Sequence, residues 1–96
     1  MSKSILQKRK ECYMCGKTQG LHDHHIYMGK NREISEAYGF KVWLCVAHHT
    51  SGDYAVHGGK YGKLLDDTMK KDCQKKFEET HSRDEFIGLI GRNYLD

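Results

Sequence analysis

Two short pairs of metal-binding residues constrain this chain more than any other feature. Cys12 and Cys15 are separated by two residues, and Cys45 and His48 repeat that spacing further along the chain. Two such turns, brought together, supply four ligands for a tetrahedral zinc ion. This spacing favours a metal over a disulfide or plain buried thiols. The sequence therefore predicts a structural zinc, with His22 as the competitor of His48 for the fourth ligand position.

The composition of the chain favours a fold stabilised by a staple such as a metal or a disulfide. Its 96 residues are 38% hydrophobic and 30% charged, which allows one domain with a thin core. The formal net charge of +3 is a mild basic bias, which favours a polyanionic partner without establishing one. We expect residues 1 to 10 to form a basic flexible arm and residues 11 to 96 to form a single domain.

The N-terminal segment has no apolar run that could serve as a signal peptide or a membrane span. We therefore expect a cytoplasmic protein without a membrane partner. In that compartment the four cysteines would be reduced thiols, and Cys73 is expected to be a helix-packing thiol rather than a ligand.

Local patterns in the first half predict an antiparallel hairpin around a short helix. Residues 21 to 27 are a strand candidate, and residues 41 to 45 are a stronger one because they are β-branched and aromatic. Between them, residues 31 to 38 are expected to form a helix that ends at Gly39. Trp43, on the second strand, is expected to lie in the core.

Two further helices are expected in the second half. The first spans residues 61 to about 80, because apolar side chains recur there at helical spacing. Its stripe comprises Tyr61, Leu65, Met69, Cys73 and Phe77. The second begins at Ser82, which forms a capping box with Glu85.

Histidines that a structural zinc does not need lie inside and just beyond the two pairs. Neutral imidazole binds metal, and its pKa near neutrality suits a general base. Adjacent strand residues point to opposite faces, so His24 and His25 can share a site only where the strand ends. If His48 holds zinc, His49 must point away from it, toward the strand that carries His24. His57 either completes a second metal site, contacts a phosphate or is an ordinary polar loop residue.

Together these motifs resemble the HNH, or His-Me finger, endonucleases. That family's pattern is Cys-x-x-Cys, then Asp/His-His-Ile/Val, an Asn, and Leu-Cys-x-x-Cys/His-His. The matching segments here are Cys12-Tyr-Met-Cys15, His24-His25-Ile26 and Leu44-Cys45-Val-Ala-His48-His49. Within that family the chain resembles the phage recombination-enhancement nucleases in the His-His-Ile and Cys-x-x-His-His elements and in a Val-His-x-Gly step at Val56 to Gly59. The resemblance covers about residues 12 to 80 and implies an α+β fold, a small ββα-metal (His-Me finger or treble-clef-like) domain with zinc and C-terminal helices.

The resemblance implies hydrolysis of DNA phosphodiester bonds with a divalent catalytic metal, Mg²⁺, Mn²⁺, Ni²⁺ or Zn²⁺. His25 would be the general base that activates water. The metal would be held by His24, His49 and His57. Phe40 stands where the family has its middle asparagine, so Asn31 or a backbone carbonyl would orient the base. The phage relatives act on DNA coated by a recombinase filament, which makes such a filament in the host cytoplasm an expected partner.

Basic residues near the surplus histidines are candidates for contacts with DNA phosphates, namely Arg32, Lys30 and Lys60. The alternative function is a non-catalytic zinc module that binds nucleic acid or protein. Such a module has no use for the surplus histidines, which favours the nuclease. A peptidase is disfavoured because the chain has no His-Glu-x-x-His helix.

Overall fold

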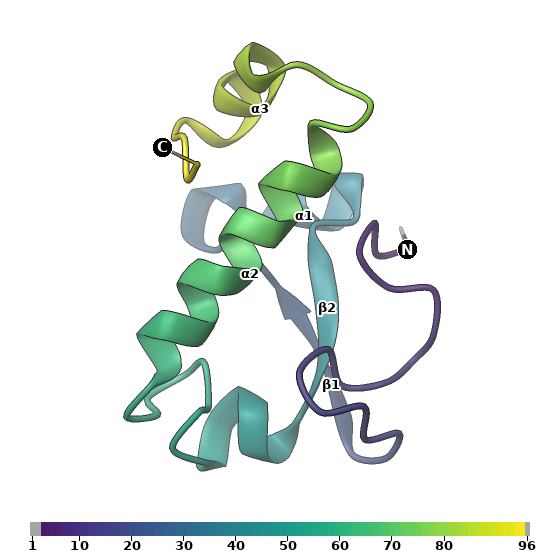
Figure 1. The fold of residues 1–96 in the computed structure, drawn as a ribbon, viewed down its shortest axis with the longest axis vertical. Helices are drawn as coiled ribbons and strands as arrows, with labels where there is room; N and C mark the ends of the chain where they lie inside the picture. Colours follow the sequence, from purple (N-terminus) through teal and green to yellow (C-terminus); the bar gives the residue numbers. More distant parts are fainter. Residues whose placement is uncertain (1–2, 96) are drawn as a thin grey trace.

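A two-stranded antiparallel sheet lies at the centre of the fold, in a computed structural model that describes residues 3–95 (Figure 1). Strand β1 comprises Leu21–His25 and strand β2 comprises Lys41–Cys45. They form the predicted antiparallel hairpin, although the first strand ends at His25 rather than continuing to Tyr27. The α+β class is confirmed. Within the described residues, no helix is long and apolar enough to cross a membrane.

The connection between the strands contains the predicted short helix. Helix α1 comprises Arg32–Tyr38 and follows a 3-10 turn at Gly29–Asn31. It ends at Gly39, whose φ of 75° lies in the left-handed region that glycine adopts without strain. This turn returns the chain into β2.

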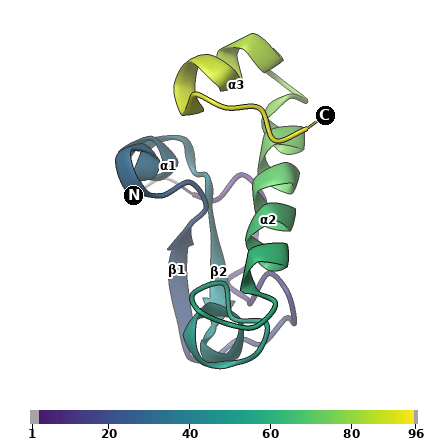
Figure 2. The ribbon, with the colours of Figure 1, turned by 90° about the vertical axis from the view of Figure 1, so that its left-hand side faces the viewer.

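Three helical segments follow β2. A π-helical turn, η2, comprises Ala47–Ser51, and a loop then leads to α2, Gly62–Phe77. Helix α3 comprises Arg83–Ile90. Helix α2 runs beside the hairpin, and α3 lies beyond the C-terminal end of α2 (Figures 1 and 2).

The start of α2 differs from the prediction. The apolar stripe is buried at Leu65, Met69, Cys73 and Phe77, but Tyr61 is 39% exposed and stacks on Tyr54 with ring centroids 4.8 Å apart. The helix begins one residue later, at Gly62, where the backbone of the preceding loop packs closely. A side chain at Gly62 would collide with the carbonyl oxygen of Ala55.

The two faces of the hairpin have different surroundings. Residues directly opposite each other on paired strands share a face, so His24 and Val42 lie on one face. Val42 belongs to the same buried cluster as Met69 of α2, which makes this the core face. Asp23 and Trp43 alternate onto the other face. Trp43 is therefore only half-buried, and the expectation that it belongs to the core is wrong.

The N-terminal segment, expected as a flexible arm, contacts the sheet along the outer edge of β2. The Ile5 amide donates a hydrogen bond to the carbonyl of Gly39 over 3.0 Å. The Trp43 amide donates to Oε1 of Gln7 over 2.7 Å, and the Tyr13 amide donates to the Trp43 carbonyl over 2.8 Å. These bonds satisfy backbone groups of an edge strand that would otherwise be free to pair with another chain.

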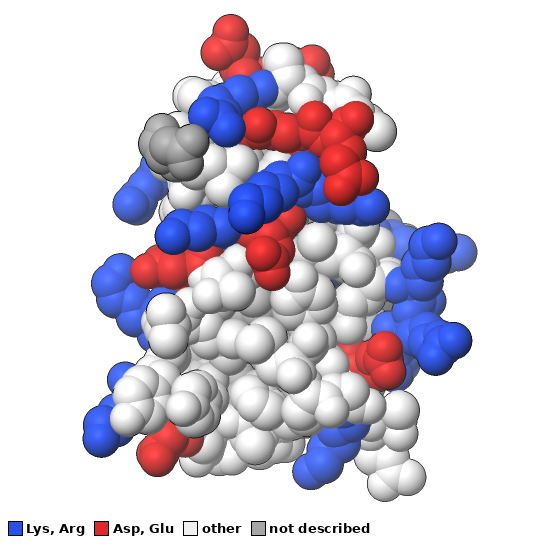
Figure 3. All heavy atoms as spheres, viewed as in Figure 1, with Lys and Arg blue, Asp and Glu red and all other residues white. Residues whose placement is uncertain are grey.

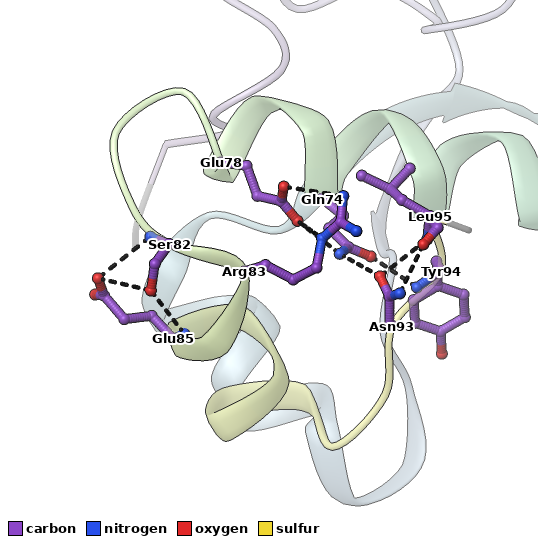
Figure 4. A network of polar contacts seen from close by, with 8 residues as sticks. All are labelled: Gln74, Glu78, Ser82, Arg83, Glu85, Asn93, Tyr94 and Leu95. Atoms are coloured by element: carbon purple, nitrogen blue, oxygen red, sulfur yellow. Dashed lines mark hydrogen bonds and ion pairs between the residues drawn. The ribbon is translucent and has the colours of Figure 1, made fainter.

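A polar network joins the end of α2 to α3 and to the C-terminal segment (Figure 4). Arg83 pairs with Glu78 over 3.1 Å, and the side-chain amide of Gln74 donates to the same carboxylate over 2.7 Å. Gln74 is fully buried, and its carbonyl oxygen accepts from the Tyr94 amide over 2.8 Å. The network therefore fixes where α3 and the following segment pack.

The capping box predicted at the start of α3 is confirmed and is also visible in Figure 4. The Ser82 hydroxyl accepts from the Glu85 amide over 3.1 Å, and the Glu85 carboxylate accepts from the Ser82 amide over 3.2 Å. We expect Ser82→Ala to lower the free energy of unfolding by about 1 kcal/mol, measured by urea denaturation. Ser82→Asp, which keeps a capping oxygen, should remain close to wild type. An equal loss in both variants would contradict this role of the cap.

Candidate metal centres

Four predicted ligands converge where the chain enters β1 and leaves β2. The ligand atoms of Cys12, Cys15, Cys45 and His48 all lie within 4.8 Å of one another. Sγ of Cys45 lies 3.3 Å from Nδ1 of His48 and 3.7 Å from Sγ of Cys15. Ligand separations of about 3.3 to 3.8 Å are expected around tetrahedral zinc, given its usual bond lengths. This cluster, which we call the zinc clamp, can hold a metal such as zinc.

Local backbone geometry builds the first half of the zinc clamp. The Gly16 amide donates to the Cys12 carbonyl over 2.9 Å, and the Cys12 amide donates to the Lys17 carbonyl over 2.8 Å. This tight turn needs a φ of 78° at Gly16, which glycine adopts without strain. The two cysteines consequently present their sulfur atoms to the end of β2.

The pKa values of the thiols in the zinc clamp indicate a site for a cation. Burial opposes ionisation of Cys12, but hydrogen bonds from the backbones of Cys45, Cys15 and Met14 outweigh it and lower the Cys12 pKa. A backbone hydrogen bond from Lys17 favours the Cys15 thiolate, yet desolvation and the neighbouring thiols raise the pKa of Cys15. Adjacent thiolates repel, so a bound cation is what allows them to ionise together.

A second cluster consists of three histidines on the core side of β1. His24 lies on β1, His49 on η2 and His57 on the following loop, and their ligand atoms lie within 4.8 Å of one another. Ring centroids are 4.7 Å apart for His49 and His57, 5.2 Å for His24 and His57, and 5.4 Å for His24 and His49. This cluster, the tri-histidine site, brings together the three residues predicted to hold a second metal.

His24 lacks a polar partner at this site. It is 1% exposed, and its Nε2 is the only buried side-chain nitrogen or oxygen without a hydrogen bond in the described part of the chain. Such an atom is costly to bury. Burial lowers the pKa of His24 to about 3, with further lowering by His49 and His57. The imidazole is therefore neutral, which is the form that binds metal.

The helical turn η2 divides two adjacent histidines between the two clusters. Consecutive residues on a helix point about 100° apart, so His48 reaches the zinc clamp while His49 reaches the tri-histidine site. The amides of Val56 and His57 donate to the carbonyls of His48 and His49 over 2.9 and 3.0 Å. These bonds place His57 beside His49. His22 contacts His49 over 2.8 Å, so His48, and not His22, belongs to the zinc clamp.

His25, predicted as a general base, lies at the end of β1 with its ring on the other face. Its Nε2 donates to Oε1 of Glu36 over 2.9 Å. Lys41 bonds the second oxygen of Glu36 over 3.0 Å and Asp23 over 3.5 Å. Asp23, His25 and Glu36 lie close enough to share a metal ion. The ammonium of Lys41 already pairs with both carboxylates, so a metal is not needed to balance their charge.

Glu36, the hydrogen-bond partner of His25, was not identified from the sequence. Asn31, expected to orient the base, instead donates its side-chain amide to the Ile90 carbonyl over 2.9 Å and ties α1 to α3. Asn31 lies just before the first turn of α1, whereas Glu36 lies one turn further along, and Glu36 is the residue that contacts His25. A single carboxylate on an amphipathic helix gives no sequence signal that would distinguish it from a solvent-exposed one.

The three predicted contacts to DNA are all exposed. Lys30 and Arg32 lie at the start of α1, and Lys60 lies on the loop that follows His57. The ammonium of Lys60 is 5.4 Å from the ring centroid of Tyr61.

Comparison with known proteins returns no match. No family model matches the sequence, and neither curated proteins nor solved structures give a significant similarity. The arrangement of the zinc clamp and the tri-histidine site therefore carries the functional interpretation.

Proposed function

We propose that this protein is a metal-dependent endonuclease of the HNH type, which hydrolyses phosphodiester bonds in DNA. The observation that carries the proposal is the tri-histidine site with its unpartnered, buried His24 nitrogen. Three protein ligands leave a coordination position open, which is typical of catalytic rather than structural metal sites. An all-imidazole ligand set favours Zn²⁺, Mn²⁺ or Ni²⁺ over Mg²⁺. In this proposal the zinc clamp binds a structural zinc that stabilises the fold of a ββα-metal domain.

The second part of the proposal concerns the proton. A divalent ion held by His24, His49 and His57 would supply charge stabilisation for hydrolysis of the phosphodiester bond. We propose His25 as the base: its Nε2 donates to Glu36, which leaves Nδ1 to take a proton from water at the end of β1, where His25 follows His24. Lys41 holds the Glu36 carboxylate from its other oxygen, which keeps the carboxylate in place.

The proposed substrate is DNA, either naked or coated by a recombinase filament. Lys30, Arg32 and Lys60 are exposed and positively charged, so they can contact phosphates without reading sequence. The alternative, a non-catalytic zinc module, accounts for the zinc clamp but gives no reason for a buried histidine nitrogen without a partner.

Nicking of supercoiled plasmid tests the proposal. We expect wild-type protein to nick naked or recombinase-coated DNA with Mn²⁺, Ni²⁺ or Mg²⁺. His57→Ala removes the most exposed of the three ligands and should raise the metal concentration needed for half-maximal rate at least tenfold, since losing even an outer-shell partner of a ligand costs roughly 10- to 100-fold.

His81→Ala is the matched control, because it removes an exposed histidine that stacks on Phe77 and belongs to neither metal centre. It should leave the metal requirement unchanged. If no metal supports cleavage of either substrate, the zinc module becomes the better description. A His57→Ala protein with the wild-type metal requirement would remove His57 from the site.

A further inference from the structure

A basic cavity lies beside the sheet face that points away from the three histidines. Its volume is about 490 Å³. It lies between the N-terminal segment and the middle of β2. Its charged lining comprises Lys3, Lys8, Arg9, Lys10, Lys41 and Asp23.

The positive charge of this basic cavity is not neutralised within the domain. Asp23 is its only carboxylate lining residue, and it is already paired with Lys41. The four cations from the N-terminal segment are exposed, and none of them forms an ion pair within residues 3–95. Figure 3 shows blue side chains gathered at the right-hand edge of the molecule, where the N-terminal segment runs in Figure 1. An anionic ligand is therefore favoured there.

Trp43 adds an aromatic surface to the same basic cavity. It lines the cavity and is half-buried, and the ammonium of Lys10 lies 4.6 Å from its ring centroid. The Trp43 amide donates to Gln7, and the Trp43 carbonyl accepts from the Tyr13 amide. These two hydrogen bonds fix the backbone that carries the ring. Lys10 is exposed, so its ammonium is accessible to a phosphate beside the ring. A half-buried indole beside exposed cations suits a nucleobase attached to phosphates.

We propose that the basic cavity binds single-stranded nucleic acid, with one base stacked on Trp43 and the adjoining phosphates on Lys8, Arg9 and Lys10. A duplex fits less well, because its bases are already stacked on one another and cannot cover the indole. Since the cavity opens on the face away from the tri-histidine site, this binding does not require cleavage. It adds a second place where the chain holds nucleic acid.

The chain provides its own probe for this site, because Trp43 is its only tryptophan. Titration with a dT oligonucleotide of about ten nucleotides, within the usual site size of single-strand binders, should quench the tryptophan fluorescence in a saturable way. No divalent metal is added, and a gel after the titration shows that the oligonucleotide is intact. Binding should weaken steeply as salt is raised.

Two variants locate the binding, measured by anisotropy of a labelled oligonucleotide. Trp43→Val should weaken binding about tenfold, the size of one lost base stack. Lys8→Ala/Lys10→Ala should lower the slope of log affinity against log salt by about 1.4, since each phosphate contact to a single strand contributes about 0.7. Lys71→Ala/Lys75→Ala removes two exposed lysines of α2, outside the cavity lining, and should bind as wild type.

Unchanged fluorescence at saturating oligonucleotide would overturn the proposal, as would equal weakening by the two double lysine variants. Duplex of the same length that quenches Trp43 as strongly would also overturn it. The outcome is independent of the endonuclease test. Quenching without plasmid nicking would support the basic cavity and contradict the nuclease, and nicking without quenching would do the reverse.

Discussion

Cys45→Ser, or removal of zinc with a strong chelator, is expected to abolish cooperative unfolding of this chain. Structural zinc contributes about 10 to 16 kcal/mol of apparent binding free energy in small zinc domains. Globular domains have only about 5 to 15 kcal/mol of net stability in total. Cys45 ends β2 and belongs to both the zinc clamp and the buried core, so its loss removes a ligand and an anchor of the hairpin. Thermal melts followed by circular dichroism measure the effect.

Cys73→Ala is the control for this result. Cys73 is fully buried on α2, and burial raises the pKa of its thiol to about 12, so it remains a neutral packing group as predicted. The variant should keep its zinc and a cooperative melt at a somewhat lower temperature. Chelated protein with the melting temperature of untreated protein would show that the zinc clamp does not hold the fold.

His25→Ala is expected to slow DNA cleavage by about 10²- to 10⁴-fold, which is the usual contribution of a positioned general base. The expected cause is loss of the ring nitrogen that accepts the proton from water, because Glu36 and Lys41 still pair with each other without His25. Single-turnover nicking at saturating metal isolates this step from metal affinity. The melting temperature and the metal content should stay close to wild type.

The comparison that decides the role of His25 is with His57→Ala. Saturating metal should restore much of the rate of His57→Ala, since that variant has lost a ligand, but should not restore His25→Ala. Equal nicking rates for wild type and His25→Ala would remove His25 from the mechanism and leave the tri-histidine site without an identified base.

The zinc clamp and the hairpin could be predicted because their signals are local. The spacing of Cys12, Cys15, Cys45 and His48 encodes chelating turns, and β-branched and aromatic residues mark β2. The capping box at Ser82 is equally local. The division of His48 and His49 between two sites also followed from the geometry of adjacent residues, and the coordinates place them accordingly.

The features that sequence reasoning missed depend on contacts between distant segments. Glu36 contacts His25 only because α1 folds back on the hairpin. Asn31 donates a hydrogen bond to Ile90 of α3, which lies much later in the chain. Trp43 faces away from the core because strand alternation places Val42 and Leu44 inward, which the composition of the strand does not reveal. The N-terminal segment reads as a basic arm, yet Gln7 pairs with the edge of β2.

Metal stoichiometry tests the central claim most directly, namely that one small domain holds a structural metal and a separate exchangeable one. Native mass spectrometry of untagged protein, with added Mn²⁺ or Ni²⁺, compares wild type with His49→Ala/His57→Ala. Wild type is predicted to carry a tightly held zinc and a second ion that a mild chelator removes. The double variant should retain only the zinc. A wild-type chain that never binds a second ion, or a double variant that binds it as tightly as wild type, would contradict the account.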